Sequence, residues 1–212
     1  MKRQIKTIHV LCIFLLTLSV VDGEAQNADT NVKALEEIQT HRKEKDAEFR
    51  DPDQSPLTKK EIRKFKGLHY FEPDLNYRVK AKFIKNEQPV LFKMKTTTDR
   101  LPDYQKYGDV IFILNGVEYK LEVYQSPDVS KKPGYEDYLF LPFTDETNGK
   151  ESYEVGRYID FRIPTTDDVV IDFNKSYSPY CSYSTGYSCV KPPEVNHLPV
   201  EVKAGEKKYR EH

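Results

Sequence analysis

The sequence lacks an excess of charge of either sign. Its 212 residues include 33 Lys and Arg against 34 Asp and Glu, which gives a formal net charge of −1 at pH 7. Attraction to nucleic acid or to an anionic membrane surface needs a concentration of basic residues, whereas here the two signs are balanced and interleaved. We therefore expect neither nucleic acid nor a membrane surface as a partner.

The motifs of the common enzyme classes are also missing. The sequence contains no G-x-S-x-G elbow, no H-E-x-x-H helix, no phosphate-binding loop and no G-x-G-x-x-G after a predicted strand. We predict no cofactor. The question of catalysis stays open, because a general base could be His41, His69, His197 or an acidic residue with a raised pKa.

Long apolar runs are confined to the first 25 residues. A basic start at residues 1–6 precedes an apolar run at residues 8–21, and small and polar residues follow. This order is typical of a secretory signal peptide, and the run is shorter than the roughly 20 residues of a membrane anchor, which is the alternative. We predict a signal peptide at residues 1–25, cleaved after Gly23 or Ala25. The protein is then exported to the periplasm or secreted, and no transmembrane segment remains.

Cysteine is rare, and only Cys181 and Cys189 follow the predicted signal peptide. In an exported protein such a pair predicts a disulfide, which stabilises the fold by roughly 2.5 kcal/mol for so short a loop. The alternative is a metal site that combines both thiolates with His197 and a carboxylate, Glu194 or Glu206. Zinc sites usually place paired cysteines two to four residues apart, so we predict the disulfide and no metal.

The rest of the chain divides into a helical start and a β-rich body. The apolar spacing in residues 27–50 indicates a surface helix, and Thr58 with Glu61 forms a capping box for a second, short helix. We predict an N-terminal helix and linker at residues 26–57 and a β-domain at residues 58–212.

Six short runs in the β-domain are rich in β-branched and aromatic residues. Asn115-Gly116 between two alternating runs predicts a type I′ hairpin. We also predict that residues 158–163 fold onto residues 169–173 as a second hairpin. The fold class is therefore mainly β (α+β), a curled antiparallel sheet or small β-barrel preceded by two N-terminal helices. The runs are YRVKAKFI, PVLFKMKT, DVIFILNGVEYKLEVYQ (a hairpin), YLFLPF, RYIDFRI and VVIDF.

Residues 172–206, which we call the C-terminal strap, are rich in tyrosine and proline. The prolines disfavour regular pairing, so we predict an extended loop that side chains hold against the domain. Its tyrosines have two interpretations: they pack against the domain, or they line a cleft for a sugar, a lipid or an aromatic ligand. The tyrosines are Tyr177, Tyr180, Tyr183 and Tyr187.

Six residues near the strap are candidates for ligand binding. The guanidinium group of Arg157 could bind a ligand carboxylate or phosphate, or it could form an internal ion pair with Asp145. Asx side chains at a strand end most often cap a turn, which is the alternative for residues 172 and 174. The candidates are Asp145, Arg157, Tyr158, Asp172, Asn174 and Tyr177.

Many of these features, in this order, resemble the DUF1684 family of bacteria and archaea, from about His41 to Glu206. The chain departs from the family pattern at Ser178-Pro179-Tyr180-Cys181, where the family has Asn-Pro-Pro-Cys. It departs again at Cys189-Val190, where the family has Cys-Pro. Family members without an export signal also carry both cysteines, which keeps the metal alternative open. The resemblance rests on Phe143, Asp145, Thr147, Gly149, Tyr153, Gly156, Arg157, Tyr158, Asp172, Phe173, Asn174, Tyr177, Pro179, Cys181, Cys189, Asn196 and Glu206.

The resemblance implies a shared fold without an established activity, so the function is inferred from the residues. Our leading hypothesis is a small-ligand-binding module of the periplasm or cell envelope. One alternative is an envelope hydrolase or lyase in which Asp145, Arg157 and Asp172 converge on one cleft. Another is a structural or assembly role, which a large exposed apolar patch would favour. The oligomeric state stays open.

Overall fold

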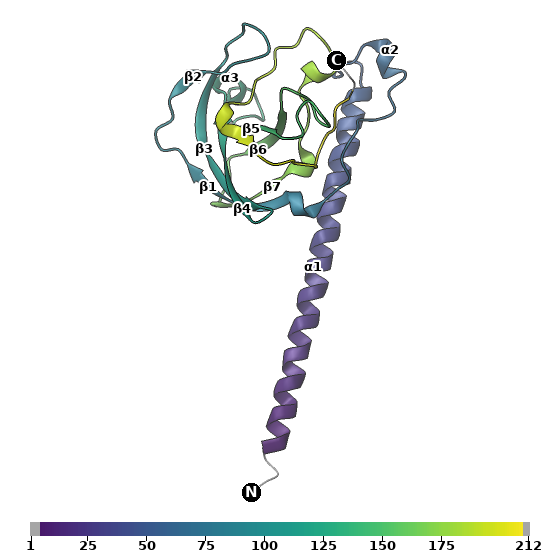
Figure 1. The fold of residues 1–212 in the computed structure, drawn as a ribbon, viewed down its shortest axis with the longest axis vertical. Coiled ribbons are helices and arrows are strands. Elements are labelled where there is room, and N and C mark those ends of the chain that lie inside the picture. The colour runs from purple at the N-terminus through teal and green to yellow at the C-terminus, as the bar shows by residue number, and fades with distance from the viewer. Residues whose placement is uncertain (1–4, 210–212) are drawn as a thin grey trace. The chain divides into compact units, whose positions relative to one another are not determined.

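A strongly curled antiparallel sheet, a half-barrel, forms the body of the computed structural model (Figure 1). The structure describes the backbone of residues 5–209 and the side chains of residues 28–209. Residues 1–40 and residues 41–212 form two separate compact units, and the whole sheet belongs to the second. The predicted fold class, mainly β with a curled antiparallel sheet, is confirmed.

The elements follow one another as short strands with one-turn helices between them. The helices are α1 (Ile5–Arg50), α2 (Lys59–Ile62), η1 (Leu75–Tyr77), α3 (Pro127–Ser130), η2 (Phe173–Lys175), η3 (Tyr180–Ser182) and η4 (Glu194–Asn196). The strands are β1 (Arg78–Lys85), β2 (Leu91–Lys93), β3 (Asp103–Leu114), β4 (Val117–Gln125), β5 (Tyr138–Asp145), β6 (Arg157–Arg162), β7 (Asp168–Asp172) and β8 (His197–Leu198).

The strand order along the sheet is β6-β5-β4-β3-β1-β7, with β2 paired to β3 and β8 paired to β5. The β3–β4 hairpin is confirmed, since Leu114 pairs with Val117 across the Asn115-Gly116 turn. Asn115 and Gly116 have φ values of 53° and 79°, the left-handed backbone that a type I′ turn requires.

The second predicted hairpin is wrong. Strand β6 pairs with β5, strand β7 pairs with β1, and the two therefore lie at opposite ends of the strand order. Residues 163–167 between them are a connection across the half-barrel rather than a hairpin turn. The partner of β7 is β1, which lies about ninety residues earlier in the chain, and short-range turn signals carry no information on such a pairing.

The two faces of the sheet carry different side chains. The main core lies on one face and includes Leu139, Leu141 and Ile159, each at most 6% exposed. A second cluster of Phe140 and Tyr158 with further aromatic residues lies on the opposite face, because successive side chains of a strand alternate between faces. This second face forms the base of the candidate site.

The helical start agrees in part with the sequence. Helix α1 includes residues 27–50 and begins earlier than predicted, at Ile5. The capping box is confirmed, since the Thr58 side chain accepts from the Glu61 amide and the Glu61 carboxylate accepts from the Thr58 amide, but α2 has only one turn. The predicted signal peptide, residues 1–25, lies outside the described side chains.

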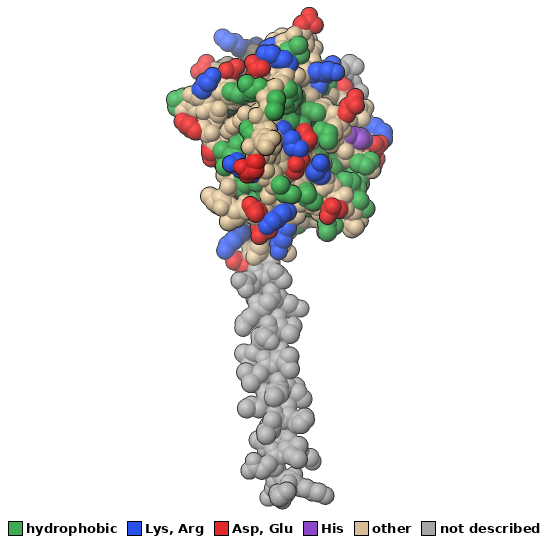
Figure 2. Space-filling view, turned by 90° about the vertical axis from the view of Figure 1, so that its left-hand side faces the viewer, with side chains coloured by type: hydrophobic (Ala, Val, Ile, Leu, Met, Phe, Trp, Pro, Cys, Tyr) green, Lys and Arg blue, Asp and Glu red, His purple; other side chains and the backbone are tan. Residues whose placement is uncertain are grey.

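Charge is distributed as the sequence predicts. Figure 2 shows acidic, basic and hydrophobic side chains interleaved over the face of the molecule in view. In the part of the chain that the structure describes, no helix combines the length and apolar character that a membrane span requires.

Candidate functional site

A cleft of about 690 Å³ lies between one end of the sheet and the C-terminal strap. Nine aromatic side chains line it, together with a smaller number of charged groups. A cleft of this volume is in the range of small-molecule sites, which are concave, mostly apolar and contain few polar groups. The aromatic residues are Phe49, Tyr104, Tyr135, Tyr138, Phe140, Tyr158, Tyr177, Tyr180 and Tyr187.

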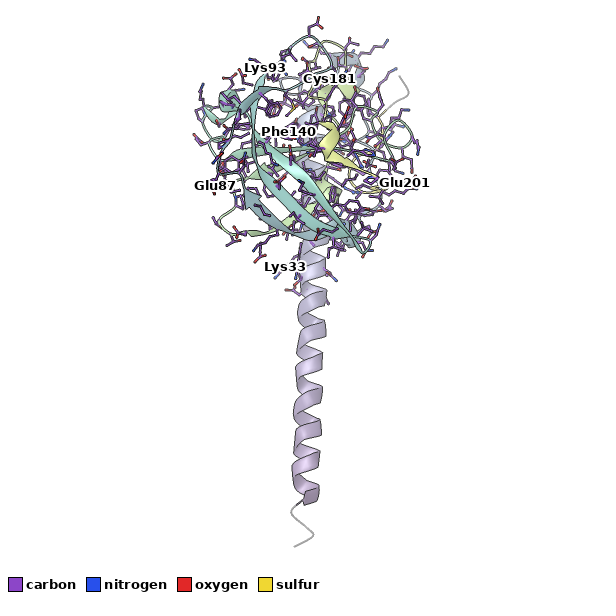
Figure 3. All side chains as sticks on the ribbon, turned by 60° about the vertical axis from the view of Figure 1, so that its left-hand side comes forward. Lys33, Glu87, Lys93, Phe140, Cys181 and Glu201 are labelled. Carbon is purple, nitrogen blue, oxygen red and sulfur yellow. A yellow bond between two sulfur atoms is a disulfide. The ribbon has the colours of Figure 1, made fainter. Side chains whose placement is uncertain are left out.

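Strands β5 and β6 supply the base of the cleft by alternation. Tyr138 and Phe140 lie two residues apart on β5, and Tyr158 and Asp160 lie two residues apart on β6. Their neighbours along each strand point into the main core. Figure 3 labels Phe140 on the sheet and Cys181 above it.

Asp160 joins two of these tyrosines. The hydroxyls of Tyr138 and Tyr177 donate to the same carboxylate oxygen, Oδ1, at 2.7 and 2.6 Å. Burial, followed by the nearby Asp160 charge, raises the pKa of both phenols, so both stay protonated at neutral pH and keep donating. This shared acceptor fixes the orientation of two cleft walls.

Basic side chains of the protein already cover several tyrosine rings. The Lys45 ammonium lies 5.0 Å from the Tyr177 ring centre and bonds to Glu48 at 2.9 Å. The Arg162 guanidinium lies 5.8 and 5.7 Å from the ring centres of Tyr135 and Tyr138. These rings therefore meet cations from the protein itself, which reduces their capacity to attract a cationic ligand.

The strap forms the opposite wall and carries a disulfide. Cys181 and Cys189 are bonded, with their sulfur atoms 2.11 Å apart, so the predicted disulfide is confirmed. The Cys189 backbone exchanges hydrogen bonds with Thr97 at 2.8 and 3.1 Å, and the Tyr158 hydroxyl donates to the Val190 carbonyl at 2.5 Å. The bridge and these bonds hold the loop that presents Tyr187 to the cleft.

Glu206 and Ser178 of the C-terminal strap also line the cleft, and they are only 2% and 3% exposed. The Ser178 amide donates to Glu206 Oε2 at 3.0 Å. Burial raises the pKa of Glu206 to about 8 against the opposing effects of the Ser178 bond, Lys45 and Arg157. This side chain is therefore mostly protonated at neutral pH, and it is a hydrogen-bond donor as well as an acceptor.

The six predicted site residues fall into two groups, and only two of them, Tyr158 and Tyr177, line the cleft. Arg157 and Asp145 form a fully buried ion pair at 2.8 Å, as the internal alternative predicted. Arg157 also donates to the backbone carbonyls of Val202, at 2.8 Å, and Ala204. The pair thus fastens the end of the strap to the sheet.

Asp172 and Asn174 also hold the backbone together. Asp172 pairs with Arg78 at 2.8 Å and accepts from the Asn174 amide at 3.0 Å. The Asn174 side chain bonds to both the amide and the carbonyl of Asp74, at 2.9 and 2.8 Å. The hydrolase or lyase alternative needed Asp172 in one cleft with Asp145 and Arg157, whereas each carboxylate is bound to its own arginine.

The comparisons with known proteins agree on the fold and name no activity. The sequence profile described as "Protein of unknown function (DUF1684)" matches residues 63–207. The chain belongs to the DUF1684 family. An uncharacterised protein of Haloarcula marismortui, solved by solution NMR, is similar at 37% sequence identity and a TM-score of 0.67, over 87% of this chain and 100% of that one. No curated protein matches the chain.

The region shared with the DUF1684 family contains most of the cleft, including the whole strap wall. Lys45, Glu48 and Phe49 of α1 line the cleft but precede the matched region. Sequence reasoning missed Asp160 and Tyr138 as cleft residues. The signal was present, since both share a strand face with an aromatic residue two positions away.

The metal alternative is not supported by the geometry. Both sulfur atoms are in the disulfide, His197 contacts Glu146 at 3.3 Å, and Glu206 bonds to Ser178. Among the described residues, no three His, Cys, Asp or Glu side chains are grouped so that they could hold a metal ion.

Proposed function

We propose that this protein is an exported binding protein for a small, neutral organic molecule, which occupies the cleft between the sheet and the strap. The observation that carries the proposal is the cleft itself, about 690 Å³ in volume and walled by nine aromatic side chains. Aromatic walls with a few oriented polar groups are the usual composition of small-molecule sites. The missing catalytic motifs favour binding over catalysis.

The charges around the cleft favour a neutral ligand. Lys45 is paired with Glu48, and Asp160 accepts from two phenols. Arg100 donates to the Ser188 hydroxyl and carbonyl, at 3.0 and 2.8 Å. A charged ligand would have to displace one of these partners and would lose the free energy of that contact.

The proposal predicts that the protein carries a bound molecule and that Tyr187 contributes to its binding. Protein isolated from its own host should carry a small molecule in native mass spectrometry, or its melting temperature should rise with a neutral sugar, lipid or phenol from a panel. Tyr187→Ala should weaken that binding at least about fivefold, because one aromatic contact contributes roughly 1 kcal/mol.

Phe92→Ala is the matched control for this change. Phe92 and Tyr187 are 36% and 38% exposed. Each ring has an edge contact with one tyrosine ring, Phe92 with Tyr124 and Tyr187 with Tyr180. Phe92 is not among the residues that line the described cleft, so its loss should leave binding unchanged. Empty spectra together with no thermal shift by any compound class would contradict the proposal, as would equal effects of the two substitutions.

Export is the second part of the proposal. The basic and apolar order of residues 1–25 supports it, and the Cys181–Cys189 disulfide is compatible with an oxidising compartment. Intact-mass analysis of the native protein should find a chain that begins after Gly23 or Ala25 with both cysteines oxidised. A full-length chain with two free thiols in the cell interior would contradict export without affecting the binding proposal.

A further inference from the structure

Two buried side chains on the strap side of the cleft each have a polar atom without a hydrogen-bond partner in the described part of the chain. Glu206 Oε1 and Ser178 Oγ have no hydrogen-bond partner among residues 28–209, although both side chains line the cleft and are almost fully buried. Buried polar atoms are satisfied in the great majority of cases, and leaving one unpaired costs about 1–3 kcal/mol. Two such atoms on residues that line the same cleft point to a position where a bound molecule supplies the missing partners.

Backbone contacts position the segment that carries Glu206. The amide of Glu206 donates to the carbonyl of Ser176 at 2.9 Å, and Glu206 also forms a β-bridge with Tyr70. Gly205 has a φ of 76°, and a Cβ there would lie 2.1 Å from Ser176 Oγ. Only glycine therefore fits at this position of the strap. A site that is fixed before binding loses little conformational entropy when the ligand arrives.

The surroundings of Glu206 determine the kind of ligand. Four titratable or charged groups face it: Lys45 and Asp46 from α1, Arg157 from β6, and Tyr70. A ligand ammonium beside Glu206 would lie near the Lys45 and Arg157 cations, and a ligand carboxylate there would lie near the Asp46 carboxylate. Both arrangements add a like-charge repulsion in a partly desolvated site, which leaves a neutral hydrogen-bonding group as the best match.

We propose that Glu206 and Ser178 are the polar anchor of the cleft, and that they bind neighbouring hydroxyl groups of a neutral, ring-shaped molecule such as a pyranose sugar. Neighbouring ring hydroxyls act as donors and acceptors at once, which matches a carboxyl group beside a serine hydroxyl. The aromatic walls pack against the apolar face of the ring. This inference rests on the proposed function, since it names the ligand class of the same cleft.

The raised pKa of Glu206, about 8, supports a donating role at neutral pH. A protonated carboxyl group can donate to a ligand oxygen through one oxygen and still accept from the Ser178 amide through the other. Loss of this proton above pH 8 would remove the donor and place a charge beside the ligand. Binding should therefore weaken as the pH rises through about 8.

The test is titration calorimetry with named probes at millimolar concentration. Neutral probes are D-glucose, D-galactose, D-mannose and N-acetyl-D-glucosamine, and their charged counterparts are D-glucuronate and D-glucosamine. We expect wild-type protein to bind at least one neutral pyranose about tenfold more tightly than both charged counterparts. Glu206→Ala and Ser178→Ala should each weaken that binding about tenfold, because each loses a buried hydrogen bond.

Two further variants separate a role in binding from a role in folding. Glu206→Gln retains a donor and an acceptor, so it should bind within about threefold of wild type at pH 7 and show no decline as the pH rises through about 8. Glu201→Ala, an exposed change in the same strap, should bind as wild type does. Variants are compared only where circular dichroism and the melting transition show a folded protein.

Each outcome bears on one of the two proposals. Wild-type binding of a neutral pyranose that survives both Glu206→Ala and Ser178→Ala would overturn the anchor and leave the cleft as a binding site. Tighter binding of a charged counterpart would overturn the neutral ligand class. If no pyranose binds but the co-purified molecule or a lipid does, the sugar assignment fails while the proposed function stands. Binding by none of these compounds overturns both.

Discussion

Arg157→Ala is expected to lower the free energy of unfolding by about 3–5 kcal/mol, because it leaves the buried carboxylate of Asp145 without its cation. The same change removes the donors to Val202 and Ala204, so the end of the strap loses its attachment to β6. Urea denaturation followed by circular dichroism measures this loss. The variant should also become susceptible to proteolysis at the strap before global unfolding.

Arg162→Ala is the matched control, since it lies on the same strand and pairs with Asp137 at 2.6 Å. Both partners of this second pair are about half exposed, and solvent-exposed ion pairs contribute at most about 1 kcal/mol. The two arginines therefore differ in burial rather than in type of contact. Equal losses from Arg157→Ala and Arg162→Ala would show that the buried pair does not hold the strap.

The second large effect is a decline in stability with rising pH. The pKa of Glu206 is raised from 4.5 to about 8 in the folded protein, so the unfolded chain releases this proton first. The stability that this raised pKa adds to the folded protein is fully present below pH 4.5 and decreases as the pH rises towards about 8. Above that pH it does not change further. The loss amounts to at most about 5 kcal/mol, since each unit between two pKa values is worth about 1.4 kcal/mol.

Glu206→Gln isolates this contribution, because the amide retains an acceptor for Ser178 and does not titrate. The variant should equal wild type in stability near pH 4.5 and exceed it near pH 8, by denaturant unfolding at each pH. His41, whose pKa is lowered mainly by burial, changes stability with the opposite sign, but this effect is common to both proteins and cancels in their difference. Parallel curves for the two proteins would refute a raised pKa at Glu206.

Local patterns predicted those parts of the fold that depend on neighbours in sequence. The type I′ turn at Asn115-Gly116, the capping box at Thr58 and the Cys181–Cys189 disulfide each depend on residues at most eight positions apart. The pairing of β7 with β1 was missed because it joins segments about ninety residues apart, for example Arg78 with Asp172. No turn residue encodes such a pairing, which follows from sheet curvature and burial instead.

The same distinction between local patterns and distant contacts applies to the residues of the candidate site. Tyr158 and Tyr177 were predicted from the density of tyrosine in and before the strap, and both line the cleft. Asp145 and Arg157 were candidates for ligand binding, and the structure instead shows the alternative, an internal pair of carboxylate and guanidinium. Glu206 was considered only as a metal ligand, because nothing in its sequence neighbourhood shows that it is buried beside Ser178.

The sequence by itself determined the mainly β class, the turn, the disulfide and the concentration of tyrosines, since composition and short spacings control all of these. The tertiary structure alone decided that β5 and β6 place their aromatic side chains opposite the main core, and that Glu206 lies among them with one oxygen free of described partners. The physical reason is that burial depends on which distant segments meet. Burial in turn sets the pKa of a carboxyl group and the need of a polar atom for a partner.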